Sequence, residues 1–359
     1  MASRPRANQL LLGLIILQLL SAAFLFYPAW RLGSWLQLPQ PLVWTLATTL
    51  FFSQVIVRVG LRHWQTRWVR GIRHVADFFL GVSPIMLGGV LLAQGAVAVF
   101  GWSTYWLALS VLALSVSLGA WGIYKAFRPT IKKVALTTDK TPTKLRFVQI
   151  SDVHIGSRSS RFLVHVVDQI TRLAPDFVCI TGDFIDERNV SLAQLSPLAQ
   201  LSMPIYFCSG NHEHYEDFDD ILGRLKELGV NVLRGDLVER HGVQILGFDD
   251  RSDPNFLALA LAEQPLRSEA YSILLFHRPI GLAHAAAHGI DLQLSGHTHN
   301  GQIKPFNWLV RMQFKYLAGR YQHGNTVLYV NPGTGTWGPT LRFGTQSEIT
   351  LFELSYEGS

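Results

Sequence analysis

The sequence predicts two parts: a four-helix transmembrane region over residues 1–128 and an α/β domain over residues 145–359, joined by a linker at 129–144. The distribution of charge first indicates this division. The first 128 residues hold ten Lys or Arg and a single acid, Asp77, whereas the remainder holds 21 basic and 24 acidic residues. The net charge of +6 therefore comes from the first part alone, which argues against a nucleic-acid-binding protein.

Long uncharged runs indicate the membrane part. Residues 7–30, 32–57 and 78–124 contain no charged side chain, and about 20 apolar residues are enough for one spanning helix. The third run has about twice that length, and Gly101 provides a turn near its middle. We therefore predict four spans, at residues 9–29, 39–57, 78–100 and 104–124.

Basic residues predict the orientation of these spans. The loop after the second span is rich in arginine, and further basic residues precede the first span and follow the fourth: Arg4, Arg6, Arg58, Arg62, Arg67, Arg70, Arg73, Lys125, Arg128, Lys132 and Lys133. With four spans these segments share one side, which the positive-inside rule makes cytoplasmic. The first span is alternatively a cleaved signal peptide, which leaves the side of the second part unchanged.

Alternating strand-like and helix-like runs predict the α/β domain. Helical patterns cover residues 161–173 and 218–228, and the alternation favours a largely parallel sheet. Cys179 and Cys208 both lie in strand-like runs, so we expect buried free thiols. The predicted strands are 145–150, 177–181, 205–209, 243–248, 272–276, 292–294, 327–330 and 349–354.

Metal-ligating residue types directly follow five of these strands. Because ligands bind at the carboxyl ends of strands in open α/β sheets, we expect these side chains to meet at one edge. Carboxylate, amide and imidazole ligands suit divalent ions such as Mn²⁺, Fe²⁺ or Zn²⁺, and seven such side chains can hold two ions if one carboxylate bridges. The seven are Asp152, His154, Asp183, Asn211, His277, His297 and His299.

The order of these segments resembles the calcineurin-like metallophosphoesterases. The family blocks D-x-H, G-D-x-x-D, G-N-H-[DE], H and G-H-x-H all occur here in sequence. The stretch 333–339, with Arg342, resembles the membrane-associated bacterial YkuE- or YaeI-like branch, which is similar to the animal transmembrane protein with metallophosphoesterase domain. Asn300 departs from this branch, where a second glycine is usual. The resemblance implies a four-layer αββα sandwich in a bacterial inner-membrane protein, and the positive-inside rule puts its catalytic domain in the cytoplasm.

The resemblance also implies a role for each side chain. It assigns Asp152, His154, Asp183 and His299 to one metal, and Asp183, Asn211, His277 and His297 to the other, with Asp183 as the bridge. Two divalent ions are thus expected, with Mn²⁺ preferred and Fe²⁺ or Zn²⁺ as alternatives. His212 is expected to protonate the leaving group, and Asp186 to orient His212.

Two further features of the sequence allow more than one interpretation. Arginine matches phosphate oxygens, so one or two of five arginines are expected to bind substrate: Arg158, Arg161, Arg278, Arg320 and Arg342. Residues 303–321 mix aromatic, apolar and basic side chains. This segment is either a cap that rests on the membrane interface and admits a lipid chain, or a core-packing excursion with ordinary surface charges.

Three functions follow as hypotheses. The first is hydrolysis of a phosphodiester or pyrophosphate bond in a lipid-linked substrate, either a phospholipid or a molecule like UDP-2,3-diacylglucosamine, which relatives in this branch cleave. This hypothesis makes membrane lipids the partners. The second is a phosphodiesterase for soluble substrates. The third is a non-catalytic membrane sensor, whose sequence mark would be the loss of a metal ligand or of His212; both are present.

Overall fold

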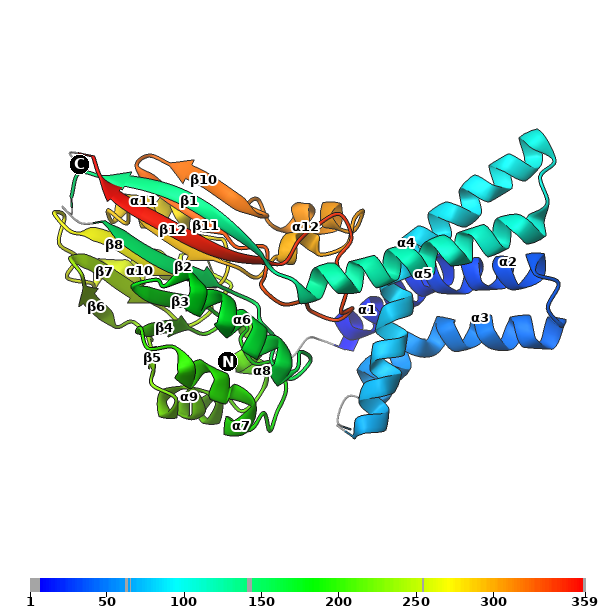
Figure 1. Cartoon of the computed structure of the whole chain (residues 1–359), viewed down its shortest axis with the longest axis horizontal. Coiled ribbons are helices and arrows are strands. Elements are labelled where there is room, and N and C mark those ends of the chain that lie inside the picture. The colour runs from blue at the N-terminus through cyan, green and yellow to red at the C-terminus, as the bar shows by residue number, and fades with distance from the viewer. Residues whose placement is uncertain (1–6, 62–63, 65, 141–143, 254, 358–359) are drawn as a thin grey trace. The chain divides into compact units, whose positions relative to one another are not determined.

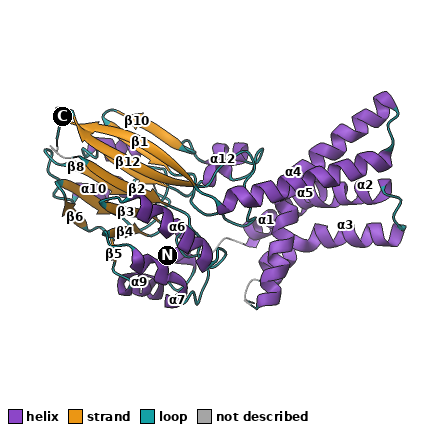
Figure 2. Cartoon of the chain, viewed as in Figure 1, coloured by secondary structure: helices purple, strands orange, loops and turns teal. Residues whose placement is uncertain are grey.

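The computed structural model describes residues 7–61, 64, 66–140, 144–253 and 255–357 and divides into two compact units (Figure 1). The first unit comprises Met1–Tyr124 and Gly338–Leu341, and the second comprises Lys125–Trp337 and Arg342–Ser359. The first unit is helical, and the strands belong to the second unit (Figure 2).

The first unit contains four helical stretches long and apolar enough to cross a bilayer, which confirms the four apolar helices predicted. The first runs through α1 (Ala7–Ser21), a π-helical segment (Ala22–Phe26) and α2 (Tyr27–Trp35). The second is α3 (Gln40–Val55), continued by a π-helical segment (Ile56–Gly60), and the others are α4 (Arg67–Phe100) and α5 (Thr104–Phe127).

The third predicted helix, at residues 78–100, starts too late in the sequence. α4 begins at Arg67, where the Thr66 hydroxyl accepts a hydrogen bond from the Val69 amide, so Arg70 and Arg73 are helical and not part of a loop. Hydropathy marks only where a helix becomes apolar, whereas arginine itself favours helix. Arg58 lies in the second π-helical segment, and Arg4, Arg6 and Arg62 lie outside the described residues.

The second unit contains two six-stranded mixed sheets. The first sheet has the order β1 (Thr130–Thr138), β12 (Glu348–Tyr356), β2 (Leu145–Ile150), β3 (Phe177–Thr181), β4 (Ile205–Cys208), β5 (Val230–Val232). The second has the order β10 (Gly319–His323), β11 (Thr326–Val330), β9 (Leu292–Ser295), β8 (Tyr271–Leu275), β7 (Val243–Gly247), β6 (Leu237–Arg240). Each sheet has a parallel centre, because β2, β3, β4 and β5 pair in parallel in the first sheet, as do β7, β8, β9 and β11 in the second.

Apolar clusters hold these layers together. Side chains of both sheets, including stacked Phe147 and Phe177, fill the space between them, with ring centroids 5.0 Å apart. Helices α6 (Ser160–Leu173) and α9 (Phe218–Glu227) cover the first sheet, and α10 (Phe256–Ala262) and α11 (Leu282–Ala287) cover the second. This α/β/β/α layering confirms the predicted fold class. The remaining helices are α7 (Leu192–Leu195), α8 (Asn211–Tyr215) and α12 (Asn307–Gln313).

The linker predicted at 129–144 is wrong over most of its length. Residues 130–138 form β1, an edge strand that pairs in parallel with β12, and 141–143 lie outside the described residues. Val134, Leu136 and Thr138 alternate inward, whereas Lys132 and Lys133 are exposed. Edge strands tolerate such charges. The partner of β1, β12, lies more than 200 residues away in the sequence, so no local pattern reveals the pairing. Cys179 and Cys208 are buried and free, as predicted.

Candidate metal centre

The seven candidate ligands lie at the carboxyl ends of strands from both sheets. β2, β3 and β4 lead to Asp152, Asp183 and Asn211, whereas β8 and β9 lead to His277 and the His297–His299 loop. We expected all seven side chains at the edge of a single sheet. They lie instead at the edge that two packed sheets share. Five candidates, Asp152, His154, Asp183, His297 and His299, have positive φ angles between 49° and 73°. A left-handed backbone costs a non-glycine residue about 1–2 kcal/mol, and such strain is concentrated at functional sites.

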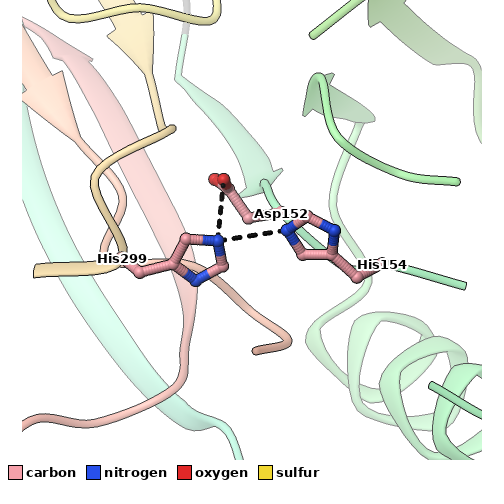
Figure 3. Close-up of side chains that lie close together, drawn as sticks. All are labelled: Asp152, His154 and His299. Atoms are coloured by element: carbon pink, nitrogen blue, oxygen red, sulfur yellow. Dashed lines mark hydrogen bonds and ion pairs between the residues drawn. The ribbon is translucent and has the colours of Figure 1, made fainter. Parts of the chain in front are cut away.

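The first cluster brings Asp152, His154 and His299 together (Figure 3). His299 Nε2 lies 3.1 Å from His154 Nε2 and 3.3 Å from the Asp152 carboxylate. His154 and Asp152 are fully buried, and His299 is 8% exposed. Ligand atoms about 2 Å from one ion are separated by roughly 3 Å from one another, so the facing nitrogens fit a divalent metal.

The second cluster consists of Asp183, His277 and His297. His277 Nε2 lies 3.1 Å from Asp183 Oδ2 and 3.1 Å from His297 Nδ1. His277 Nδ1 donates to the Thr181 carbonyl at 2.7 Å, which directs Nε2 into the cluster. Although burial opposes its protonation, the facing Asp183 carboxylate raises the pKa of His277 to about 10. Negative charge at this position therefore favours a bound cation.

Asp183 belongs to both sides of the site, and Asn211 carries a buried oxygen atom without a partner. Asp183 also forms a group with His154 and His212, so its carboxylate is shared between the two sides. The Asn211 side chain is 8% exposed, and its Oδ1 atom is buried with no hydrogen-bond partner among the described residues. A buried, unpaired amide oxygen is costly unless a ligand satisfies it. The donor set therefore fits two divalent cations on either side of Asp183.

Asp186 contacts His154, whereas the sequence-based expectation paired it with His212. Its Oδ2 lies 3.2 Å from Nδ1 of His154, and its Oδ1 accepts from the Ser157 amide at 2.9 Å. The Asp186 side chain is only 4% exposed. A carboxylate on the far nitrogen of a metal-ligating imidazole fixes its tautomer and increases its basicity. Asp186 is thus placed to position a candidate metal ligand, and spacing alone did not distinguish His154 from His212.

His212 is partly buried and lies next to Asp183 and His154. Its amide donates to Asp183 Oδ1 at 2.8 Å, and its ring centroid is 4.8 Å from that of His154. The rings of Tyr215 and Trp337, both more than half exposed, lie 5.7 and 6.2 Å from His212. Burial and the nearby His154 lower the pKa of His212 to about 4. This imidazole therefore lies between the metal clusters and an aromatic rim.

Glu213 is a site residue that the motif analysis left without a role. Its buried carboxylate accepts hydrogen bonds from four backbone amides, those of Asp183, Phe184, Ile185 and Gly210, at 2.7–3.0 Å. It thus ties the loop after β3 to the loop after β4. The acidic last residue of the G-N-H-[DE] block was the available signal, because a carboxylate can accept hydrogen bonds from several backbone amides.

Glycines in two motif blocks are explained by close approach. A Cβ on Gly210 would overlap the Asp183 carboxylate and backbone, and one on Gly296 would overlap the Ser151 hydroxyl and the Asp152 carboxylate. Asn300 adopts φ 53° and ψ 28°, a conformation that asparagine tolerates better than most residues. The departure from the usual glycine therefore preserves the loop.

Two of the five candidate phosphate-binding arginines are buried structural residues. Arg158 is 2% exposed, donates to the Ala126 carbonyl at 2.8 Å, and lies between the rings of Phe127 and Phe162. Arg342 is 1% exposed and donates to four backbone carbonyls, including that of His299. Neither guanidinium is accessible to substrate, and the sequence carried no information on their burial.

Arg278 is the arginine that lies beside the clusters. Its Nε is 3.0 Å from both Asp250 oxygens, and its Nη1 lies 3.4 Å from Nε2 of His297. The Arg278 side chain is 17% exposed, so Asp250 holds it in place while part of it faces solvent. Arg161 and Arg320 are exposed, on α6 and β10.

This combination of an αββα fold and strand-end Asp, Asn and His clusters defines a metal-dependent phosphoesterase class. The chain belongs to the calcineurin-like phosphoesterase family. Residues 145–301 match the family "Calcineurin-like phosphoesterase". In addition, the chain is more than 30% identical in sequence to a metallophosphoesterase and covers more than two thirds of that protein's length. That relative, the uncharacterized YkuE of Bacillus subtilis, is 33% identical over 232 residues, which cover 58% of this chain and 78% of that protein.

Two further relatives resemble the chain over a similar range. An uncharacterized metallophosphoesterase of Helicobacter pylori strain J99 is 35% identical, with 65% of this chain and 66% of that protein covered. The transmembrane protein with metallophosphoesterase domain of Danio rerio is 31% identical, with 67% and 61% covered. The chain thus spans slightly less than two thirds of the length of these two relatives.

Proposed function

We propose that this protein is a membrane-anchored, two-metal hydrolase of a phosphodiester or pyrophosphate bond in a lipid-linked substrate. The observation that carries the proposal is the pair of ligand clusters on either side of Asp183, at the common edge of two sheets. Family membership supports the reaction class. A phospholipid and a UDP-2,3-diacylglucosamine-like molecule are the two substrate types considered.

The proposed metal ligands keep the assignment drawn from the family resemblance. Asp152, His154 and His299 would hold one ion and Asn211, His277 and His297 the other, while Asp183 would contribute to both. Mn²⁺ is the proposed metal, with Fe²⁺ or Zn²⁺ as alternatives, because the ligands combine hard oxygen with imidazole nitrogen. Bound divalent ions supply Lewis-acid activation of water and neutralise charge on the phosphoryl oxygens.

The remaining side chains orient the substrate and move a proton. His212 is proposed to donate a proton to the departing oxygen. A phosphoryl anion beside it favours the imidazolium and so opposes the burial that lowers the pKa of His212. Tyr215 and Trp337 flank this imidazole, so the leaving group departs past their exposed rings. Arg278, held by Asp250, is proposed to contact a phosphoryl oxygen next to His297.

Two observations support a substrate in the membrane. The four apolar helices are long enough to anchor the chain in a bilayer, and a relative is named as a transmembrane protein. The dense basic segments between and after the spans favour a cytoplasmic site in a bacterial inner membrane. The soluble-substrate alternative shares the same metal site and differs only in what the surrounding surface binds.

The test is an activity profile of the full-length chain in lipid nanodiscs with Mn²⁺, Fe²⁺ or Zn²⁺. Phospholipids and nucleotide-linked diacyl lipids are compared with bis-p-nitrophenyl phosphate, with Asp183→Asn as the inactive control, since both clusters lose a carboxylate. We expect metal-dependent turnover that favours a lipid substrate. Turnover of the soluble diester with no lipid hydrolysed would favour the soluble-substrate function, and no turnover by a metal-loaded protein would favour a sensor.

A further inference from the structure

Helix α12 presents an apolar surface that none of the described helices or strands covers. Of its seven residues none is buried, and Trp308, Leu309 and Met312 are 55%, 43% and 75% exposed. The spacing i, i+1, i+4 places these three side chains within one face of a helix. A short helix gains most of its stability from packing an apolar face, so this face has the character of a surface that a partner covers.

Basic side chains surround this apolar face. Lys304, Arg311 and Lys315 are exposed, and residues 303–321 contain no aspartate or glutamate. None of these three cations takes part in an ion pair between described residues. Exposed Trp and Leu beside Lys and Arg is the composition that binds the headgroup region of an anionic membrane.

The segment that carries α12 is fastened to the His297–His299 loop. Phe314, one residue after α12, lies with its ring 4.9 Å from that of His297, and the Thr298 hydroxyl donates to the Leu317 carbonyl. On the other side, a Cβ on Gly301 would overlap the Asn307 backbone at the start of α12. Ile303 and Leu317 are buried at the two ends of the segment. The core-packing alternative therefore describes these two ends, whereas the helix between them is a surface element.

We propose that the α12 surface, formed by Trp308, Leu309 and Met312 with Lys304, Arg311 and Lys315, inserts into the headgroup region of an anionic leaflet. Its occupant is the bilayer in which the chain is anchored. Because Phe314 and Leu317 connect this segment to His297 and Thr298, docking brings a lipid phosphoester beside the metal clusters. This inference rests on the proposed function only for that last step, since docking itself needs no turnover.

Docking is tested by a fluorescent probe on residue 312, independently of activity. Met312→Cys in the full chain is labelled with an environment-sensitive dye, because native Cys179 and Cys208 are buried and do not compete. Leu259→Cys is the matched control, because Leu259 is 74% exposed on α10 and that helix contains no basic residue. In phosphatidylglycerol nanodiscs we expect a blue shift and quenching by brominated lipid at position 312 but not at 259. Equal signals at both positions would overturn the docking proposal.

Positioning of the substrate is tested by Trp308→Ser/Met312→Ser. We expect kcat/KM for a lipid phosphodiester to fall about tenfold or more, with kcat/KM for bis-p-nitrophenyl phosphate unchanged. An equal loss on both substrates would show damage to the site and overturn substrate positioning. If the 312 probe inserts while no lipid is hydrolysed by the wild type, docking stands and the proposed function fails. A 312 signal that depends on protein concentration and not on lipid would identify a second copy of the chain as the occupant, and overturn the proposal.

Discussion

The carboxylate of Asp186 lies 3.2 Å from Nδ1 of His154, and both side chains are almost fully buried. Because Nε2 of the same imidazole faces His299, the ring has a carboxylate on one side and a candidate metal position on the other. This arrangement sets the tautomer that leaves Nε2 free for a metal. Asp186 is therefore placed to influence metal binding through His154, and its contact does not extend to the proposed proton donor among the described residues.

Asp186→Ala is expected to weaken divalent metal binding by about 10- to 100-fold, because His154 loses the partner that orients it. Asp186→Asn should have a smaller effect, since its amide oxygen still accepts from Nδ1. Metal content after dialysis and titration of Mn²⁺ measure this directly. Asp168→Ala, an exposed acid on α6, is the control. If Asp186→Ala kept full metal affinity but released poor leaving groups more slowly, Asp186 would instead act by orienting His212.

His212→Ala is expected to keep both metals and to lower kcat by roughly 10²–10⁴-fold, because no positioned acid then protonates the departing oxygen. The loss should shrink for p-nitrophenyl esters, whose leaving group needs no proton. Comparing esters of graded leaving-group pKa measures this dependence. Release of metal from the variant would contradict the proton-donor role, because His212 also lies within reach of Asp183 and His154.

Glu213→Gln is expected to destabilise the loops after β3 and β4. One side-chain oxygen is replaced by an NH₂ group, so two of the four amides lose their acceptor, at about 1–3 kcal/mol for each unsatisfied donor. Faster hydrogen exchange at Asp183, Phe184 and Gly210 and a lower denaturation midpoint are the readouts. Glu227→Gln, at an exposed position of α9, should change neither.

Metal affinity is expected to rise with pH through a proton on His277. Its pKa of about 10 lies above the usual value for histidine, so at pH 7 the metal-free side chain is protonated. A metal must displace that proton, and affinity should therefore increase about tenfold per pH unit until the pKa is passed. Calorimetry in buffers of different ionisation enthalpy counts the released proton. The same pairing stabilises the metal-free fold at low pH and loses this contribution as pH rises toward 10. Binding without proton release at pH 7 would contradict this account.

Local sequence was sufficient for the elements whose signal is local. Uncharged runs mark the four apolar helices, and the strands 145–150 and 177–181 were predicted with their observed bounds. Motif order was sufficient to nominate the ligands, because the strand-end residues carry the donor types that metals need. β1 was missed because it is an edge strand with two lysines, and only its pairing with a strand distant in the chain makes it part of the sheet.

The sequence by itself determined the class of protein, the apolar helices and the residues that nominate a metal centre. Only the tertiary structure decided which carboxylate faces which imidazole, that Arg158 and Arg342 are buried while Arg278 faces the clusters, and that the α12 surface is uncovered. The physical reason is that residue type and spacing specify chemistry and local conformation. Pairing, burial and exposure depend instead on how separate segments pack together, and those contacts are formed in space and not along the chain.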